Sequence, residues 1–380
     1  MQQVVLTKQA LVTGEGALQY LKNVEYHTAV IVTGGQSMAR TGVLERVQKI
    51  MEKEGRQSFI FSGISKNPTK AQVLEGVEFL KEKQPDVVLA VGGGSSIDAA
   101  KVMVLFYEYP ELSFENVFSA PLEEKKRKTL LIAVPSTSGT ASEVTHISVI
   151  TLEDQQFKAA IKTENIRPDI AILDGTIPMT LPSHIAAETG MDALTHALEA
   201  YINKSGNDFT DALAKEAIEG LMEWLPKSYE EGDLESRSKV HNYQCMAGMA
   251  FGNSGLGIVH GVSHAFGGKY NLAHGLANAI ILPYSMDYNK KEAAVKKKYE
   301  KLSKILGADI IEKVKELKKS LKIPDCIAQA GVSEQQFLAD FEVLTDYALK
   351  GATVVNPLPV SRQDMQKFLR CIYYGKKVDF

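Results

Sequence analysis

The sequence predicts an α/β domain with a parallel sheet, of the Rossmann-like kind, followed by an all-helical domain. In the first half, short runs of β-branched and aliphatic residues alternate with helical patterns, and glycine-rich turns follow two of these runs. After Pro178 and Pro182 the β-branched runs stop, and patterns rich in Ala, Leu, Glu and Lys continue to the end. A chain of 380 residues has room for two hydrophobic cores. We therefore expect the α/β domain over residues 1–180 and the helical domain over residues 181–380.

The α/β prediction depends on four short runs that have the composition of buried parallel strands. They occupy residues 28–33, 58–62, 86–91 and 130–134. Amphipathic stretches at 41–54 and 69–83 lie between them, and the second is preceded by Asn67 and Pro68 in the order of a helix cap. Strand, helix and strand in this order are typical of a sheet built from βαβ units.

A glycine turn links the run at 86–91 to the helical pattern that follows. The turn reads Gly92-Gly93-Gly94-Ser95-Ser96 and leads directly into IDAAKVMVLF. A strand, a glycine turn and a helix N-terminus together form an anion site, because backbone amides can approach a pyrophosphate and the helix dipole adds partial positive charge. The turn is neither G-x-G-x-x-G nor a Walker loop, so a tight turn without a ligand is the alternative.

Two further loops follow predicted strands at the edge where open parallel sheets bind ligands. Residues 135–143 are crowded with hydroxyl side chains, which either face a ligand or cap the following segment through Thr140 or Ser142. The loop Gly34-Gly35-Gln36-Ser37 lacks the acidic residue that commonly binds the ribose 2′-hydroxyl of NAD. Its small residues and the Ser37 hydroxyl leave room for a 2′-phosphate, with Arg40 as a counter-charge, so NADP(H) is favoured over NAD(H). A simple turn whose ligand contacts lie elsewhere is the alternative.

The helical half carries a cluster of histidines and one aspartate at helical spacing. Asp192 and His196 are four residues apart, as are His260 and His264, and His274 follows after a Gly-Gly pair. Histidine and carboxylate ligands with an open position are typical of catalytic zinc or iron sites, whereas the H-E-x-x-H spacing of metalloproteases is absent. As alternatives, each histidine alone could be a core residue, and Asp192 could cap a helix or form an ion pair. The spacing does not decide which histidines bind the metal.

Composition and charge limit the possible partners. The formal net charge is −3 and no long run of like charge occurs, so neither a nucleic acid nor an acidic membrane surface is indicated. The lysine-rich segment 289–322 keeps its apolar residues at helical spacing and is interpreted as a solvated helix face. The cysteines Cys245, Cys326 and Cys371 form no C-x-x-C pair, and no secretion signal or apolar span stands out. We expect a soluble cytoplasmic protein that acts on small molecules.

Several of these motifs, in this order, resemble the iron-containing (group III) alcohol dehydrogenase family over nearly the whole chain. The matching segments are Gly92-Gly93-Gly94-Ser95 with Asp98, PSTSGTASEVT at 135–145, GMDALTHALEAY at 190–201, VHGVSHAFGG at 259–268 and NLAHGLANAI at 271–280. The resemblance implies a Rossmann-like dinucleotide-binding domain and a helical metal-binding and substrate domain, an architecture shared with dehydroquinate synthase. It also implies an active site in the cleft between these domains and a homodimer.

The resemblance also implies roles for individual residues. The four metal ligands are Asp192, His196, His260 and His274, and the metal is Fe²⁺, with Zn²⁺ or Mn²⁺ as alternatives because imidazole and carboxylate accept all three. His264 is expected beside the substrate and nicotinamide, without a metal bond, as the catalytic residue that relays the alcohol proton or as a residue that only orients ligands. The cofactor contacts include Asn67, Gly93, Gly94, Ser95, Thr137, Thr140 and Lys158, in addition to Gly34, Gly35 and Ser37. Asp98 either contacts the cofactor or caps its helix.

The activity implied is hydride transfer between NAD(P) and a small primary alcohol or aldehyde. The segment VTGGQSMARTGVL at 32–44 resembles the subgroup of NADP-dependent butanol dehydrogenases and broad-range aldehyde reductases. Phe251, Leu256 and Val149 lie beside the motifs as pocket walls or core residues, and no single substrate is predicted. The alternatives are a metal-dependent lyase or cyclase resembling dehydroquinate synthase, and a sensor that binds nucleotide and metal without turnover. The intact set of candidate ligands favours the enzyme over the sensor.

Overall fold

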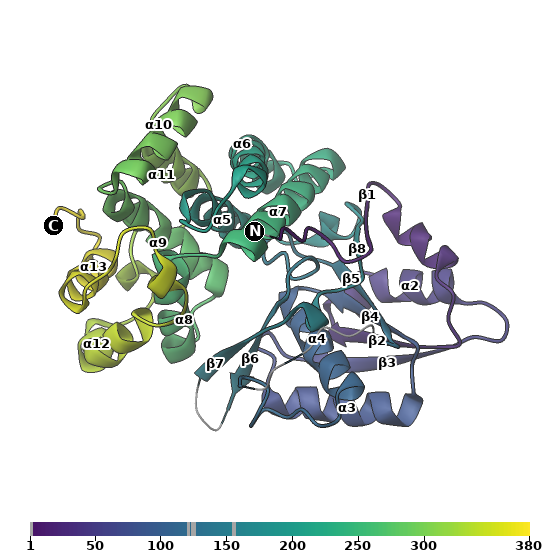
Figure 1. Ribbon diagram of the computed structural model, residues 1–380. Helices are drawn as coiled ribbons and strands as arrows, with labels where there is room; N and C mark the ends of the chain where they lie inside the picture. The colour runs from purple at the N-terminus through teal and green to yellow at the C-terminus, as the bar shows by residue number, and fades with distance from the viewer. Residues whose placement is uncertain (1–2, 120–121, 123–126, 154–156) are drawn as a thin grey trace. The chain divides into compact units, whose positions relative to one another are not determined.

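The computed structural model describes residues 3–119, 122, 127–153 and 157–380. The chain divides into two compact units, Met1–Leu181 and Pro182–Phe380. A parallel sheet with helices on both faces forms the first unit, and helices alone form the second (Figure 1).

A six-stranded sheet with the strand order β1-β8-β5-β4-β2-β3 organises the first unit, and every neighbouring pair is parallel. Its strands are β1 (Ala10–Thr13), β2 (Thr28–Gly34), β3 (Gln57–Ile64), β4 (Val87–Gly92), β5 (Leu130–Pro135) and β8 (Ile170–Leu173). All residues of β4 are buried, as expected of a central strand covered on both faces. The predicted fold class and the four predicted strands are confirmed.

Alternate residues of the strands supply two separate cores, one on each face of the sheet. Val30 and Val32 of β2 pack with α3 (Lys70–Lys83) and α4 (Gly94–Glu108). Ala29 and Ile31 of the same strand face the other way and pack with α2 (Val43–Met51) and the short helix η1 (Ala17–Asn23). The labelled helices can be followed on either side of the strands in Figure 1.

The helix boundaries of this unit differ from the predicted ones in two places. The stretch predicted as one helix over 41–54 contains only α2, and a separate single turn, α1 (Ser37–Arg40), precedes it, because Gly42 takes the left-handed conformation with φ of 72°. Helix α3 is capped by Thr69, which forms a capping box with Gln72. The predicted cap-like role of Asn67 is therefore wrong.

Four strands of this unit were not among the predicted ones. Strands β1 and β8 have four residues each, too few to show a period. Strands β6 (Ile147–Leu152) and β7 (Phe157–Lys162) form a separate antiparallel pair in which β6 alternates buried and half-buried residues. This pair follows directly after the hydroxyl-rich segment at 135–145.

The second unit is helical, as predicted: all of residues 182–380 are described, and none of them is in a strand. Its helices are α5 (Ser183–Ile202), α6 (Asp208–Glu230), α7 (Leu234–Ser254), α8 (Ile258–Tyr270), α9 (His274–Asn289), α10 (Ala293–Leu306), α11 (Ile310–Ser320), α12 (Glu334–Ala348) and α13 (Arg362–Tyr374). Helix α5 is the central one, because most of its residues are buried and it contacts α6, α7 and α9.

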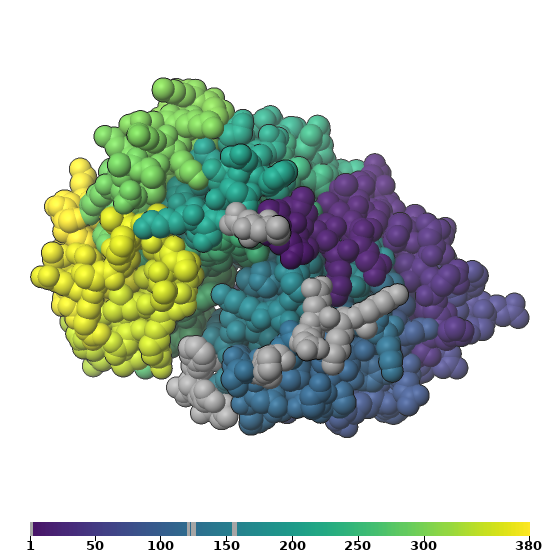
Figure 2. Space-filling view, in the orientation of Figure 1, coloured from purple at the N-terminus to yellow at the C-terminus, as the bar shows by residue number. Residues whose placement is uncertain are grey.

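The lysine-rich segment 289–322 forms the amphipathic helices α10 and α11. Val295, Tyr299 and Leu302 of α10 are buried at helical spacing while most of its lysines are exposed, so the predicted solvated helix face is confirmed. Helix α10 lies at the surface in Figure 2. Among the described residues, no helix is long and apolar enough to cross a membrane. The three cysteines are buried free thiols.

Candidate metal centre and cofactor-binding loops

Three side chains of the second unit bring potential ligand atoms together. Asp192 of α5, His260 of α8 and His274 at the start of α9 each offer one atom, and these atoms lie within 4.8 Å of one another. The side chains of Asp192 and His260 are 4% and 2% exposed, whereas that of His274 is 33% exposed. Carboxylate oxygen and imidazole nitrogen form a donor set that suits a divalent transition metal. The residues therefore fit a metal ion, and the side of His274 is open to solvent.

His196, the fourth expected ligand, lies one helical turn after Asp192 on α5. Its Nε2 is 4.0 Å from Asp192 Oδ1. Its ring is stacked between the ring of Phe251, with centroids 4.4 Å apart, and that of His260, at 4.6 Å. Phe251, expected as a pocket wall or a core residue, is buried against His196 and limits the orientations of its ring.

Glycines next to two of these histidines allow the helices to approach closely. A Cβ atom on Gly275 would lie 2.4 Å from the carbonyl oxygen of Glu188 on α5. A Cβ atom on Gly261, the residue after His260, would lie 1.9 Å from Oγ1 of Thr353. Both distances are far below van der Waals contact. Glycine is therefore required directly after His260 and after His274, because any larger residue would prevent the close packing that positions each histidine.

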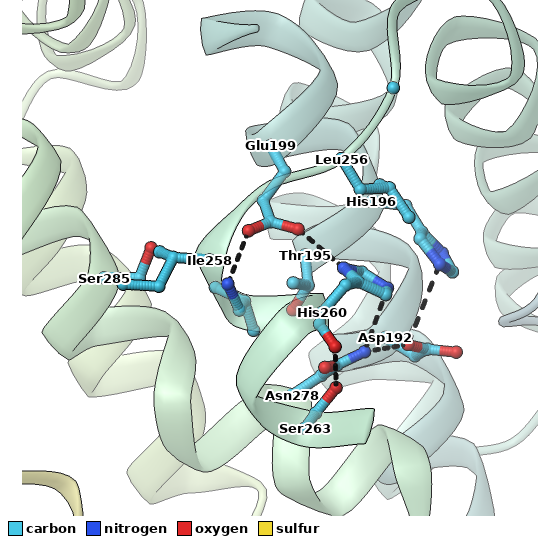
Figure 3. A network of polar contacts seen from close by, with 12 residues as sticks. Asp192, Thr195, His196, Glu199, Leu256, Ile258, His260, Ser263, Asn278 and Ser285 are labelled. Atoms are coloured by element: carbon cyan, nitrogen blue, oxygen red, sulfur yellow. Dashed lines mark hydrogen bonds and ion pairs between the residues drawn. The ribbon is translucent and has the colours of Figure 1, made fainter. Parts of the chain in front are cut away.

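Glu199 is a member of this site that the sequence reasoning missed. Its Oε2 is 2.6 Å from Nδ1 of His260, and its Oε1 accepts a hydrogen bond of 2.7 Å from the backbone amide of Val259 (Figure 3). Burial raises the pKa of Glu199 to about 8 and lowers the pKa of His260 well below its usual value. Because Glu199 engages Nδ1, the opposite nitrogen of a neutral His260 ring faces the candidate ligands, as metal binding requires.

Asn278 is a second residue that the sequence reasoning missed. It lies one turn after His274 on α9, and its Nδ2 is 2.6 Å from Asp192 Oδ1, 3.2 Å from His260 Nε2 and 3.1 Å from His274 Nε2. The amide nitrogen thus lies where the three ligand atoms converge. Figure 3 shows it between Asp192 and His260.

His264, the predicted catalytic residue, lies beside the three candidate ligands. Its ring is stacked on that of His274, with centroids 5.0 Å apart, and meets the ring of His260 edge-on at 6.0 Å. It does not belong to the group of three that can share one ion. The side chain is half-buried, so it has access both to the site and to solvent.

In the first unit, the glycine loops lie where the strand order reverses. The chain runs from β2 to β3 on one side and then returns to β4 on the other side of β2. The loops after β2 and β4 flank this switch point, where doubly wound sheets bind ligands. Gly93 occupies the N-cap of α4 without a side-chain hydrogen bond, and the first turn of α4 carries no acidic residue. This helix start therefore suits a phosphate group.

The predicted cofactor contacts of the three loops lie next to one another. A Cβ atom on Gly94 would lie 2.6 Å from Thr140 Oγ1, one on Gly93 would lie 3.4 Å from Thr137, and one on Gly34 would lie 2.8 Å from Ser96 Oγ. Gly35 has a φ of 55°, which favours glycine, and Ser37 begins α1. The glycines are thus required where the loops approach each other.

Asn67, Ser95 and Lys158 form a second set of adjoining residues. Lys158 Nζ donates a hydrogen bond of 2.9 Å to Asn67 Oδ1, and the Ser95 hydroxyl donates to the carbonyl of Lys66. Burial, and then the nearby charge of Lys66, lower the pKa of Lys158. Two lysines therefore place positive charge beside the loop that begins α4, as an anionic cofactor requires.

Asp98 does not cap α4, so that alternative is wrong. The helix begins at Gly94, and the Asp98 carboxylate accepts hydrogen bonds from the Ser142 hydroxyl and, at 2.9 Å, from the backbone amide of Val149. Lys101 is buried beside it and donates to Ser142 Oγ and to the carbonyl of Ile147, both at 2.8 Å. Burial lowers the pKa of Lys101 to about 8. This network fixes the hydroxyl-rich loop to α4.

The hydroxyl-rich loop itself caps no helix, because β6 follows it. Within the loop, Thr140 Oγ1 accepts a hydrogen bond of 3.3 Å from the backbone amide of Ser142.

Of the expected pocket walls, Val149 belongs to β6, and the carbonyl of Leu256 accepts a hydrogen bond of 2.9 Å from Asn203. Val149 and Leu256 are half-buried.

Comparison with known proteins covers both units. The chain matches the family model described as iron-containing alcohol dehydrogenase over residues 9–175, and the model of the C-terminal part of the Fe-containing alcohol dehydrogenase family over residues 186–373. It is 40% identical to the NADPH-dependent butanol dehydrogenase of Clostridium saccharobutylicum, over 97% of each chain. It is 35% identical to an alcohol dehydrogenase of Thermococcus barophilus, over 97% of this chain and 98% of that one.

Solved structures are similar over the same length. The iron-containing alcohol dehydrogenase of Thermococcus thioreducens has a TM-score of 0.92 and 35% identity, covering 99% of this chain and 100% of that one. A 1,3-propanediol oxidoreductase has a TM-score of 0.90 and 28% identity, covering 98% of this chain and 100% of that one.

The contact between Glu199 and His260 generates a test of the candidate metal centre. Glu199→Gln keeps the size of the side chain but replaces the carboxyl group that engages Nδ1 of His260 by an amide, so Zn²⁺ affinity is expected to fall about 10- to 100-fold. Affinity is measured by competition with a chelator of known strength. Glu235→Gln, at an exposed position of α7, serves as the matched control and should bind like the parent. Equal affinities in both variants would show that Glu199 does not support the site.

Proposed function

This chain belongs to the iron-containing alcohol dehydrogenase family, and we propose that it transfers hydride between NADP(H) and a small primary alcohol or aldehyde at the metal centre of its second unit. The predicted family and the predicted enzyme class, alcohol dehydrogenase, are confirmed by the two family models and the similar alcohol dehydrogenases. The observation that carries the proposal is the convergence of Asp192, His260 and His274 on one point. The names of two similar proteins, a butanol dehydrogenase and a 1,3-propanediol oxidoreductase, support small primary alcohols as substrates.

The proposed ligands are Asp192, His196, His260 and His274, with Fe²⁺ as the metal and Zn²⁺ or Mn²⁺ as alternatives. When bound, such an ion supplies a Lewis acid for the oxygen of the alcohol or aldehyde. The protein contributes orientation: Glu199 fixes the ring of His260, and Phe251 fixes that of His196. The partial exposure of His274 leaves a direction from which substrate can approach.

His264 is proposed as the residue that relays the alcohol proton. Oxidation of an alcohol to an aldehyde releases a hydride, which a bound nicotinamide would accept, and one proton, which must reach solvent. A histidine exchanges protons near neutral pH. The half-buried ring of His264, stacked on His274, has access to both the site and solvent.

Replacement of the histidines separates metal binding from proton transfer. His260→Ala should lose most of the bound metal and nearly all turnover, because it removes one ligand. His264→Ala should keep the metal and turn over more slowly. Metal content is measured by elemental analysis, and turnover is measured as the steady formation of reduced cofactor from a short alcohol. A lyase that uses its cofactor only transiently would not accumulate reduced cofactor. The reverse result, metal lost with His264 and kept without His260, would contradict the ligand assignment.

The proposed cofactor is NADP(H), held by the first unit. The loop after β2 carries no carboxylate that would repel a 2′-phosphate, and the 40% identical butanol dehydrogenase is named as NADPH-dependent. Arg40 is exposed, and its Nη2 donates a hydrogen bond of 2.5 Å to Gln36 Oε1, so its guanidinium lies beside this loop. Gly34 has a further reason to be glycine, because a Cβ atom there would lie 2.8 Å from the carbonyl oxygen of Ile64.

Arg40 therefore offers a better test of cofactor choice than Gly34, where any side chain would strain the sheet. Arg40→Gln removes a charge-assisted contact with the 2′-phosphate, so kcat/KM with NADPH should fall about tenfold or more while kcat/KM with NADH stays the same. Both are measured with a series of short aldehydes. Arg46→Gln is the control, because Arg46 is exposed on α2 and bonded to Thr176. A parent enzyme that prefers NADH, or equal losses with both cofactors, would contradict the proposal.

We also propose that the enzyme is a cytoplasmic homodimer. The free thiols of Cys245, Cys326 and Cys371 support a reducing compartment. The dimer rests on the resemblance to the family.

A further inference from the structure

The amide group of Asn278 occupies the point toward which the candidate metal ligands are directed. Its nitrogen is within hydrogen-bond distance of Asp192 Oδ1, His260 Nε2 and His274 Nε2, at 2.6, 3.2 and 3.1 Å. The residue is fully buried, at 0% exposure. These contacts come from three different helices, α5, α8 and α9.

The contacts satisfy a group of atoms that would otherwise repel one another. An Nε2 nitrogen that binds a metal carries no hydrogen, so in that tautomer both imidazoles and the carboxylate oxygen are acceptors, and burying acceptors without a donor is unfavourable. Asn278 Nδ2 carries two hydrogens and is the donor that faces all three atoms. Its partial positive charge stands where the positive charge of an ion would be.

The orientation of the Asn278 amide leaves one of its own polar atoms without a hydrogen bond. Within the described part of the chain, the buried Oδ1 of Asn278 has no hydrogen-bond partner. The side chain therefore satisfies the ligand atoms at the expense of its own oxygen, which buried amides rarely do. An NH₂ group cannot keep this orientation beside a cation, because its hydrogens would point at the positive charge.

We propose that Asn278 is a placeholder of the metal centre: its amide holds the ligand atoms in position when no metal is bound and turns away when a metal enters. The inference rests on the proposed metal centre. A group that stabilises only the metal-free protein opposes metal binding to the same extent, by linkage. Asn278 thus keeps the site preformed and at the same time weakens its affinity for the ion.

The test compares Asn278→Ala with a matched variant on the same helix. Asn289 of α9 is also fully buried and bonded through its amide, to Ser285 and Asn356, so Asn289→Ala removes a similar side chain at a position with no contact to the ligands. The full-length protein is stripped of metal, and Zn²⁺ affinity is measured by chelator competition. Unfolding temperatures are measured for the metal-free and the Zn²⁺-loaded forms.

Asn278→Ala is expected to bind Zn²⁺ about tenfold more tightly than the parent and to enlarge the rise in unfolding temperature on loading, because only the metal-free form loses a hydrogen bond to a charged group. Asn289→Ala should lower the unfolding temperature of both forms equally and leave the affinity unchanged. Asn278→Asp keeps the side-chain shape and replaces the donor by an acceptor, so it should also bind Zn²⁺ more tightly than the parent. This variant replaces Asn278→Ala in the test if the alanine variant does not fold.

Three results would overturn the placeholder role. Weaker Zn²⁺ binding in Asn278→Ala would make the side chain a contributor to the loaded site. Equal destabilisation of both forms with unchanged affinity would reduce Asn278 to packing, as in the Asn289 control. A parent protein that binds no Zn²⁺ would remove the metal centre itself, and the placeholder with it.

Discussion

The structure of the second unit depends on one interaction: potential ligand atoms from three helices converge on one small volume. Asp192, His260 and His274 supply these atoms. The surrounding features follow from keeping them there. Gly261 and Gly275 let the helices approach, because a Cβ atom at either position would overlap a neighbour. Glu199 fixes the ring of His260 from behind, and Asn278 supplies donor hydrogens to the site itself.

In the first unit, the constraint is the close approach of three loops to one another at one edge of the sheet. The parallel sheet brings the ends of β2, β4 and β5 to one edge, and glycines at Gly34, Gly93 and Gly94 keep the loops close together. The buried network of Asp98, Lys101 and Ser142 then holds the hydroxyl-rich loop against α4. Both units thus rely on networks of buried polar groups to position their candidate site residues.

The sequence was most informative where a pattern repeats over several turns or strands. The four strands and the helical second half were predictable because their periods are strong, whereas β1 and β8 are too short to show one. The aspartate and histidine pairs were found as chemistry-bearing residues at helical spacing. Glu199 and Asn278 were missed, although each lies about one helical turn after a histidine, at His196 and His274. Their roles come from contacts between helices, which no pattern within one segment reveals.

Binding of one metal ion by side chains of α5, α8 and α9 can be observed in crystals of the Zn²⁺-loaded protein measured at the zinc absorption edge. We expect a single anomalous peak with the Asp192 oxygen and the nitrogens of His196, His260 and His274 about 2.0–2.2 Å away. A zinc peak elsewhere on the chain, or a site with the Asn278 amide still between Asp192 and His260, would contradict it.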